Sequence, residues 1–178
     1  MVISMPATGR GHRNYPLCQH SDACTDCLDV IESIAMQVNA EAEIEASSER
    51  IWHILTDFGS YPEWNPFLSR VQGELGVGNT LVVNAGSSEG KQWRFKPKVS
   101  IVDPARELRW QGQLVYRGLF YGEQFFLLRA LAGDRTRVTS GGNFAGLLLK
   151  YMGSFLTDTA RGFVGMNQAL KARAEKRF

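Results

Sequence analysis

Residues 47–67 read SSERIWHILTDFGSYPEWNPF, and the pattern of this stretch changes part-way along it. Ser47 supplies a hydroxyl cap, and apolar residues recur at helical spacing over residues 51–58. The first half therefore predicts a short amphipathic helix. Pro62 and Pro66 then exclude a long helix in the second half, because proline lacks the backbone N–H that an interior turn requires.

The second half is unusually aromatic for a loop. Residues 56–68 hold four aromatic side chains and two prolines, too much apolar area for an ordinary surface connection. The prolines restrict the conformations of the segment, and Trp64 and Phe67 offer area to bury. We expect a short, rigid element that closes one end of a small-molecule cavity.

Alternating apolar residues on both sides of this segment predict strands. Residues 36–46 alternate before it. After it, strands are expected at residues 69–75, 79–85, 91–103, 107–116, 119–131 and 135–144. The clearest of these patterns is 91–103, where one face is apolar and the other basic, as in an antiparallel sheet with one wet side. Pro97 within it indicates an edge position or a bulge.

The chain ends in a long apolar stripe with helical spacing, from about Leu147 to Lys176. Helices are thus segregated from a run of antiparallel strands, which predicts an α+β fold. The apolar faces of sheet and helix must meet. If the sheet curves away from the helix, the space between them is a cavity.

Composition bounds the function. The chain has 178 residues and a net charge of +2, which is too small to indicate a nucleic-acid partner. It contains no apolar run long enough to be an integral membrane segment and no secretory signal pattern. We therefore expect a cytoplasmic location.

The N-terminal stretch holds several potential metal ligands: His12, Cys18, His20, Cys24 and Cys27. The spacing of CTDC suits a chelate, but no surrounding apolar pattern could build a small metal-binding fold. A transit peptide is a further alternative, which the acidic residues oppose. We expect residues 1–35 to be a disordered leader, residues 36–178 to form one domain, and no metal or other cofactor to be bound.

Three motifs, SSERIWHILTDFGSYPEWNPF, GLFYGEQFF and FAGLL, resemble the START-like (SRPBCC) superfamily, and within it the polyketide cyclase/dehydrase-like group. The resemblance covers roughly residues 36–175. It implies the Bet v 1-like helix-grip fold: a curved seven-stranded antiparallel sheet wrapped around a long C-terminal helix, with two short helices after the first strand. It also implies an internal hydrophobic cavity.

Residues on the inward faces form the expected ligand site. They are Trp64, Phe67, Trp93, Phe95, Trp110, Leu114, Tyr116, Phe120, Gln124, Phe126, Ser140, Phe144, Phe155, Thr159 and Phe163. Each apolar member could instead fill a solid core, and each polar member could instead satisfy a backbone group. The paired glycines Gly141 and Gly142 are expected to thin a strand, or to permit a bulge, and so make room for a ligand.

The function expected from this site is binding, and possibly transport, of a lipophilic small molecule such as a lipid, polyketide or isoprenoid. A cyclase or dehydratase acting in the same cavity is one alternative. Relatives often have histidine where this chain has Gln124, and glutamine cannot move a proton near neutral pH, so whether the protein is an enzyme stays open. A protein-interaction module of the co-chaperone type is the other alternative, although the sequence specifies no protein partner.

Overall fold

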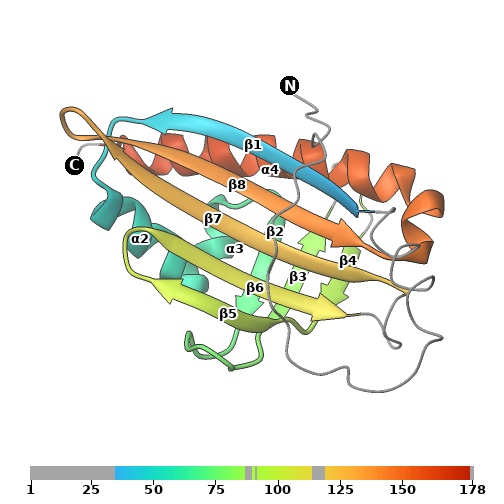
Figure 1. Ribbon diagram of the computed structural model, residues 1–178. Helices are drawn as coiled ribbons and strands as arrows, with labels where there is room; N and C mark the ends of the chain where they lie inside the picture. The colour runs from blue at the N-terminus through green and yellow to red at the C-terminus, as the bar shows by residue number, and fades with distance from the viewer. Residues whose placement is uncertain (1–34, 87–89, 91, 114–118, 177–178) are drawn as a thin grey trace, which may run out of the picture.

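The computed structural model describes residues 35–86, 90, 92–113 and 119–176 (Figure 1). The described elements are β1 (Ala35–Ile44), α2 (Ser48–Thr56), the 3-10 turn η1 (Phe58–Ser60), α3 (Tyr61–Trp64), β2 (Leu68–Gln72), β3 (Val82–Gly86), β4 (Gln92–Phe95), β5 (Lys98–Asp103), β6 (Glu107–Gln113), β7 (Tyr121–Leu131), β8 (Arg135–Ala145), the 3-10 turn η2 (Leu147–Tyr151) and α4 (Gly153–Ala174). The expected leader lies outside the described residues except for Ala35, which begins β1.

The strands form two antiparallel sheets, one in the order β1-β8-β7-β6-β5 and one in the order β2-β3-β4. The single strand expected over residues 91–103 is wrong, because it divides at Pro97 into β4 and β5, which belong to different sheets. The described strands therefore number eight rather than the expected seven. The sheets stay joined at this break, where the Leu81 N–H donates to Pro97 O (2.9 Å) and the Val99 N–H to Asn79 O (2.9 Å).

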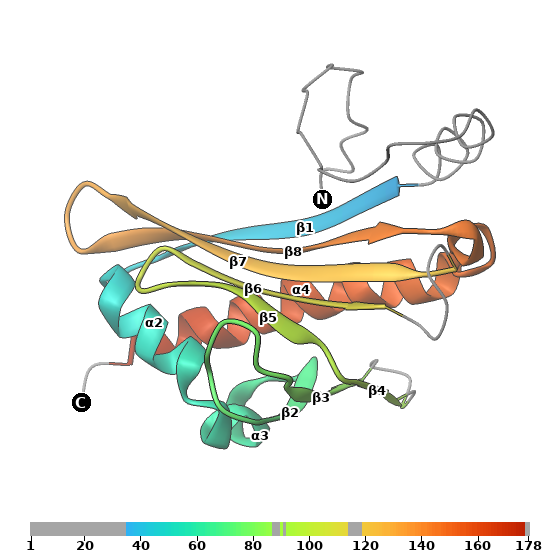
Figure 2. The same cartoon turned by 60° about the horizontal axis from the view of Figure 1, so that its bottom comes forward.

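Helix α4 lies along one face of the five-stranded sheet, and β2–β4 with α3 lie beyond it on the same side (Figure 2). The helix expected from residue 147 begins later, at Gly153. The 3-10 turn η2 comes first, and Met152, whose backbone is not helical, separates η2 from α4. A buried polar contact fixes α4 against the sheet. The Ser140 hydroxyl donates to Asn167 Oδ1 (2.6 Å), and Asn167 Nδ2 donates to Ala40 O (2.9 Å).

The helix expected after Ser47 is confirmed. Helix α2 begins at Ser48, and Ser47 Oγ accepts a hydrogen bond from the Arg50 N–H (3.3 Å), which satisfies one of the free donors of the first turn. The apolar stripe of the helix places Ile51 and Leu55 in the core with no exposed surface. The local sequence is therefore sufficient to explain this element.

The aromatic segment that follows α2 plugs one end of the core. Pro62 lies in the first turn of α3, where its missing N–H costs nothing. Tyr61 is fully buried, and its hydroxyl donates to Leu55 O (2.7 Å). Burial, with a smaller contribution from the charge of Asp57, raises the pKa of this hydroxyl. The Phe58 ring packs edge-on against a core tryptophan, so the segment is well packed.

None of the helices within the described residues is both long and apolar enough to cross a membrane.

Candidate functional site

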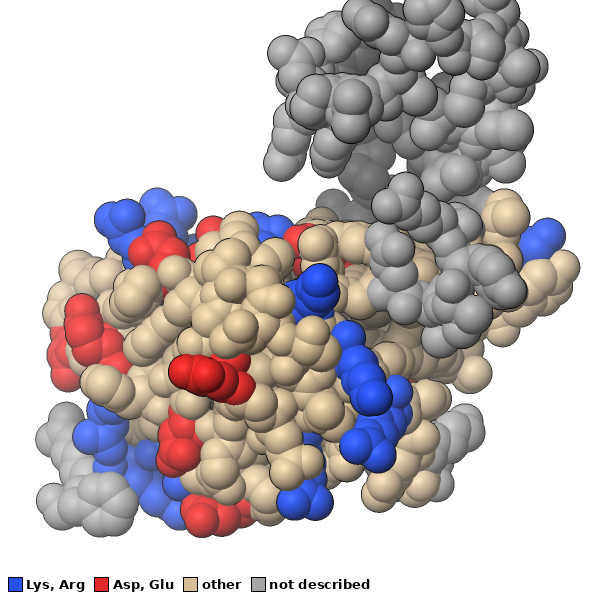
Figure 3. Space-filling view, turned by 90° about the horizontal axis from the view of Figure 1, so that it is seen from below, with Lys and Arg blue, Asp and Glu red and all other residues tan. Residues whose placement is uncertain are grey.

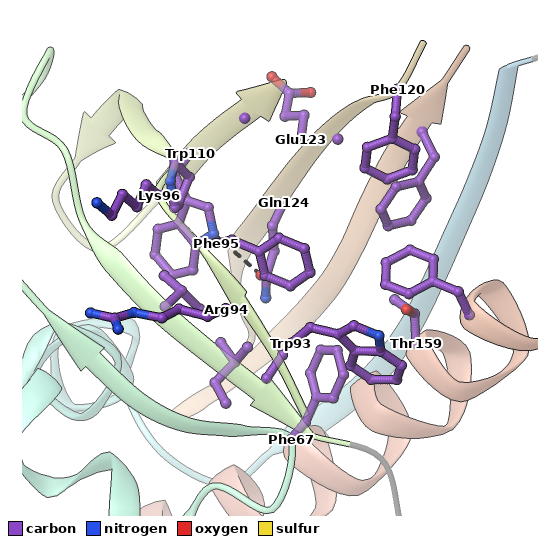
Figure 4. Close-up of a pocket in the computed structure, with 18 of the residues that line it drawn as sticks. Phe67, Trp93, Arg94, Phe95, Lys96, Trp110, Phe120, Glu123, Gln124 and Thr159 are labelled. Atoms are coloured by element: carbon purple, nitrogen blue, oxygen red, sulfur yellow. Dashed lines mark hydrogen bonds between the residues drawn. The ribbon is translucent and has the colours of Figure 1, made fainter. Parts of the chain in front are cut away.

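A cavity of about 220 Å³ lies between the two sheets and the first half of α4 (Figure 4). Strands β3 and β4 form one wall, β6, β7 and β8 form the second, and α4 forms the third. Phe155, Thr159 and Phe163 reach it from α4, because residues four apart lie on the same face of a helix. The cavity is partly open, and Arg94 and Lys96 lie among the residues around it.

Most of the lining is aromatic. The Phe155 ring is the centre of this group, with ring-to-ring centroid distances of 5.4 Å to Trp93, 6.0 Å to Phe120 and 5.7 Å to Phe144. All three contacts are close to perpendicular, an arrangement that aromatic pairs prefer. The rings therefore support one another around the empty space, although they do not fill it.

Gln124 brings a buried hydrogen-bond donor to this apolar wall. It lies opposite Trp110 in the β6–β7 register, and the indole Nε1–H donates to Gln124 Oε1 (3.2 Å; dashed in Figure 4). This bond fixes the orientation of the Gln124 amide, so Nε2 is the remaining polar atom of the side chain. Within the described residues, Gln124 Nε2 is buried and has no hydrogen-bond partner.

Thr159 brings a second polar group. It is only 3% exposed, and within the described part of the chain its Oγ1 has no hydrogen-bond partner. Thr157 on the same helix shows the usual alternative, since its hydroxyl donates to Gly153 O one turn earlier (3.0 Å). A buried polar atom left unpaired costs about 1–3 kcal/mol. Both atoms belong to residues that line the same cavity.

Glu123 borders the cavity, but its carboxylate does not face the cavity. The side chain points away from Gln124 (Figure 4), as alternation along β7 requires. Its Oε2 accepts hydrogen bonds from Arg109 Nη1 (3.2 Å) and Asn143 Nδ2 (2.8 Å). Arg109 also pairs with Glu107. The Glu123 carboxylate is therefore held as part of an ionic network on the other face of the sheet.

Comparison with known families identifies the chain. The family model described as "Polyketide cyclase / dehydrase and lipid transport" matches residues 35–175. The chain belongs to this family. The match contains every described strand and helix in full, which confirms the resemblance and the helix-grip fold expected from the sequence. No sequence among curated proteins matches the chain.

Solved structures agree on the fold. The ZhuI aromatase/cyclase from Streptomyces sp. R1128 is 18% identical, with a TM-score of 0.66 over 80% of this chain and 95% of that one. A truncated norcoclaurine synthase from Thalictrum flavum is 17% identical (TM-score 0.63; 82% and 96%). A START superfamily protein from Mycobacterium smegmatis is 23% identical (TM-score 0.59; 78% and 97%). At these identities the likeness extends to the fold alone.

The structure brings most of the residues that the sequence singles out to the cavity of this family member. Those that line it are Phe67, Trp93, Phe95, Trp110, Phe120, Gln124, Phe144, Phe155, Thr159 and Phe163. Leu114 and Tyr116 lie outside the described residues. Alternation along the strands and helical spacing along α4 were sufficient to find the inward faces.

Three of the expected residues lie elsewhere. Trp64 packs against Tyr61 (ring centroids 5.2 Å apart) at the plugged end of the core, so of the predicted lid pair Trp64 and Phe67 only Phe67 reaches the cavity. Phe126 has no exposed surface and packs into the solid core. Ser140 points inward as expected, but its hydroxyl is already bonded to Asn167.

Gly141 and Gly142 do not make room for a ligand. The β8 register runs through both without a bulge. A Cβ on Gly141 would overlap the Phe125 ring, and one on Gly142 would lie 2.8 Å from Phe144 Cε2. The space that these glycines leave is filled by the protein's own phenylalanines, so the expectation is wrong.

A different glycine pair lines the cavity and was not predicted. Gly112 and Gly122 face each other across β6 and β7. A Cβ on Gly112 would have ordinary contacts, the nearest to Pro97 at 3.7 Å, so Gly112 leaves real space. Each glycine occupies an inward position of its strand, but only the β6–β7 register shows that the two are paired. The basic Arg94 and Lys96, expected on a solvated outer face, also border the cavity.

Proposed function

We propose that this protein binds a compact, largely apolar small molecule in the cavity, with a hydrogen-bond acceptor of that molecule facing Gln124. The observation that carries the proposal is the pair of buried, unpartnered polar atoms, Gln124 Nε2 and Thr159 Oγ1, in a wall of aromatic rings. Binding sites for small molecules have this composition, mostly apolar with a few polar groups that fix orientation. A lipid, polyketide or isoprenoid with a carbonyl or hydroxyl oxygen has the required chemistry.

Volume limits the ligand. At about 220 Å³ the cavity is smaller than the range of about 300–1,000 Å³ usual for ligand pockets. A molecule of two or three fused rings suits it, or a longer one whose remainder leaves through the opening. The presence of open space also favours a small-molecule site over a protein-interaction module, for which the interior would serve only as a core.

Binding is favoured over catalysis by the chemistry of the lining. Similar structures include an aromatase/cyclase and a norcoclaurine synthase, so a cyclase or dehydratase remains the second candidate. Such a reaction calls for a group that moves a proton at the substrate. Among the described lining residues, the only carboxylate is that of Glu123, which is already bound to Arg109 and Asn143.

The proposal is tested by measuring what the purified protein carries. Native mass spectrometry, followed by organic extraction, should find a lipophilic molecule at stoichiometric amount. Thr159→Val should lower its retention several-fold, because the ligand loses one hydrogen bond worth about 0.5–1.5 kcal/mol. The same variant, stripped of ligand, should be more stable than the wild type by about 1 kcal/mol, because it no longer buries an unpaired hydroxyl.

Thr157→Val is the matched control, since Thr157 is on the same helix but exposed and bonded to Gly153 O. It should retain ligand normally and gain no stability. An empty wild-type protein that also fails to take up added ligands would contradict the proposal. So would a Thr159→Val protein that behaves like the control in both measurements.

A further inference from the structure

A polar hollow adjoins the cavity at Lys96 and Gly112, and this junction is called the mouth below. A second pocket is lined by Lys96, Lys98, Gln111, Gly112 and Tyr121, and it shares Lys96 and Gly112 with the main cavity. The Tyr121 hydroxyl donates to Gln111 Oε1 (2.8 Å), which gives this hollow a hydrogen-bonded polar wall. An apolar cavity and a polar hollow thus lie side by side at Gly112, which has no side chain to separate them.

Positive charge is concentrated around this mouth. The division of the chain at Pro97 places Lys96 directly after β4 and Lys98 at the start of β5. In Figure 4 the side chains of Arg94 and Lys96 extend away from the aromatic rings of their neighbours in β4, and all three cations are exposed. Figure 3, seen from the side of these strands, shows a row of Lys and Arg side chains on this face.

These cations are not neutralised within the described part of the chain. No described carboxylate lies within 4 Å of the charged atoms of Arg94, Lys96 or Lys98, whereas Arg109 on nearby β6 pairs with both Glu107 and Glu123. The field at the mouth is therefore positive. An anion placed there would meet favourable charge without having to displace an existing ion pair.

We propose that the ligand is an amphiphile: its apolar body occupies the cavity and a single anionic group, such as a carboxylate, sits at the mouth beside Lys96 and Lys98. This inference rests on the proposed function and specifies the class of ligand. Burying the charge among the aromatic rings would be costly, so the anionic end must lie at the opening. Lysine is suited to this role, because a flexible point charge can follow an anion without fixed geometry.

The test uses two fluorescent probes that share one apolar body. 8-Anilinonaphthalene-1-sulfonate carries a sulfonate, and N-phenyl-1-naphthylamine lacks it. Both are titrated into ligand-free wild-type protein, Lys96→Gln/Lys98→Gln, and the control Arg106→Gln/Arg129→Gln. The control removes the same charge from two exposed positions near the β5–β6 and β7–β8 turns, which do not line either pocket.

The lysine variant should bind the sulfonate probe roughly two- to thirtyfold more weakly than the wild type, because two exposed charge contacts contribute about 0.2–1 kcal/mol each. The neutral probe should be unaffected, and the control should bind both probes like the wild type. Raising the salt concentration should weaken sulfonate binding to the wild type more than to the lysine variant, which keeps only Arg94 of the three cations. Circular dichroism and thermal unfolding should show that all variants are folded.

Two failures are distinguishable. If the neutral probe binds the wild type but the lysine variant binds the sulfonate probe equally well, or the control loses as much, the amphiphile inference is overturned and the proposed function stands. If neither probe binds the wild type, or binding is not displaced by the other probe, the proposed function fails and the inference with it.

Discussion

The two ends of α4 face interiors of opposite kinds. Towards its C-terminal end, Met166 and Leu170 are fully buried in a solid core that includes Leu55 and Tyr61 from the α2–α3 region. Towards its N-terminal end, Phe155 and its aromatic neighbours surround an open cavity. Both ends are rich in large apolar side chains, so abundance of apolar residues does not separate a packed interior from a hollow one.

What separates the two ends is whether their unpartnered polar atoms border open space. At the packed end the Tyr61 hydroxyl donates to Leu55 O. Trp64 Nε1 and Asn65 Nδ2, which are unpartnered within the described part of the chain, do not border the cavity. At the hollow end Gln124 Nε2 and Thr159 Oγ1 find nothing among the described residues, and Gly112 contributes no side chain to the wall. The candidate ligand site is thus recognised by unpartnered polar groups that border open space.

The largest expected effect contrasts two phenylalanines that both belong to the sequence-predicted site. Phe126→Ala should lower the free energy of unfolding by about 3–5 kcal/mol, since its ring is fully buried in the packed core. Phe95→Ala should cost less than about 2 kcal/mol, because its half-buried ring already borders empty space, but should weaken ligand binding. Urea unfolding of ligand-free protein measures both. Equal losses of stability would remove the distinction between the two ends.

Pattern alone could not separate these two residues. Both lie on the inward face of a strand, and the alternation that identifies this face is a local property of the sequence. Whether an inward ring contacts a neighbouring side chain depends on the distances among the two sheets and α4. These distances are set by pairing between segments that are remote in sequence. The same holds for the hydroxyls: Ser140 is satisfied by Asn167, which is remote in sequence, whereas Thr159 is not.

The fold itself was more accessible from the sequence. Strand alternation, the Ser47 cap and the terminal apolar stripe gave the elements and their order, and the aromatic 47–67 motif indicated the family. The prediction was wrong at Pro97, because an alternating pattern runs through a proline that in the structure ends one strand and precedes the next. The unpredicted glycine pair at Gly112 and Gly122 is visible only once the β6–β7 register is known.

A second comparison uses two glycines of α4. Alanine normally stabilises a helix interior by about 1 kcal/mol relative to glycine. Gly165→Ala should show most of this gain, because its nearest neighbour would be Pro66 Cγ at an ordinary 3.6 Å. Gly162→Ala should instead destabilise by about 1–3 kcal/mol, since its Cβ would lie 2.6 Å from Phe67 Cε2 and force that ring to move.

Thermal and urea unfolding of the two glycine variants give the sign directly. Displacement of Phe67, which lines the cavity, should also change ligand affinity in Gly162→Ala and leave it unchanged in Gly165→Ala. If Gly162→Ala were as stabilising as Gly165→Ala, the close packing of Phe67 on α4 would be refuted.

The smallest effect concerns the hydroxyl at the packed end. Tyr61→Phe should destabilise by about 1–2 kcal/mol, because Leu55 O is left without its buried donor. Tyr151→Phe, at a residue 76% exposed, should change stability by less than about 0.5 kcal/mol. Neither should alter ligand binding. A loss of affinity in Tyr61→Phe would show that the two ends are coupled.

Alkaline pH offers a check on the same group. The pKa of Tyr61 is raised in the folded state by burial, so its contribution to stability is complete below the ordinary tyrosine pKa of about 10 and is lost as the pH rises above it. Between pH 9 and 11, the wild type should therefore lose more stability than Tyr61→Phe. Identical pH profiles would mean that Tyr61 is not buried as described.

The most direct test of the ligand site is the NMR signal of the Gln124 side-chain amide, assigned by its disappearance in Gln124→Leu. Two probes of the same shape, 1,4-naphthoquinone and naphthalene, differ in having or lacking a hydrogen-bond acceptor. The account predicts that the quinone moves one Gln124 Nε2 proton downfield and that naphthalene does not, because only the quinone can satisfy the buried donor. If the quinone binds and the Gln124 amide shifts no more than with naphthalene, the cavity does not bind its ligand through Gln124, and the central claim is wrong.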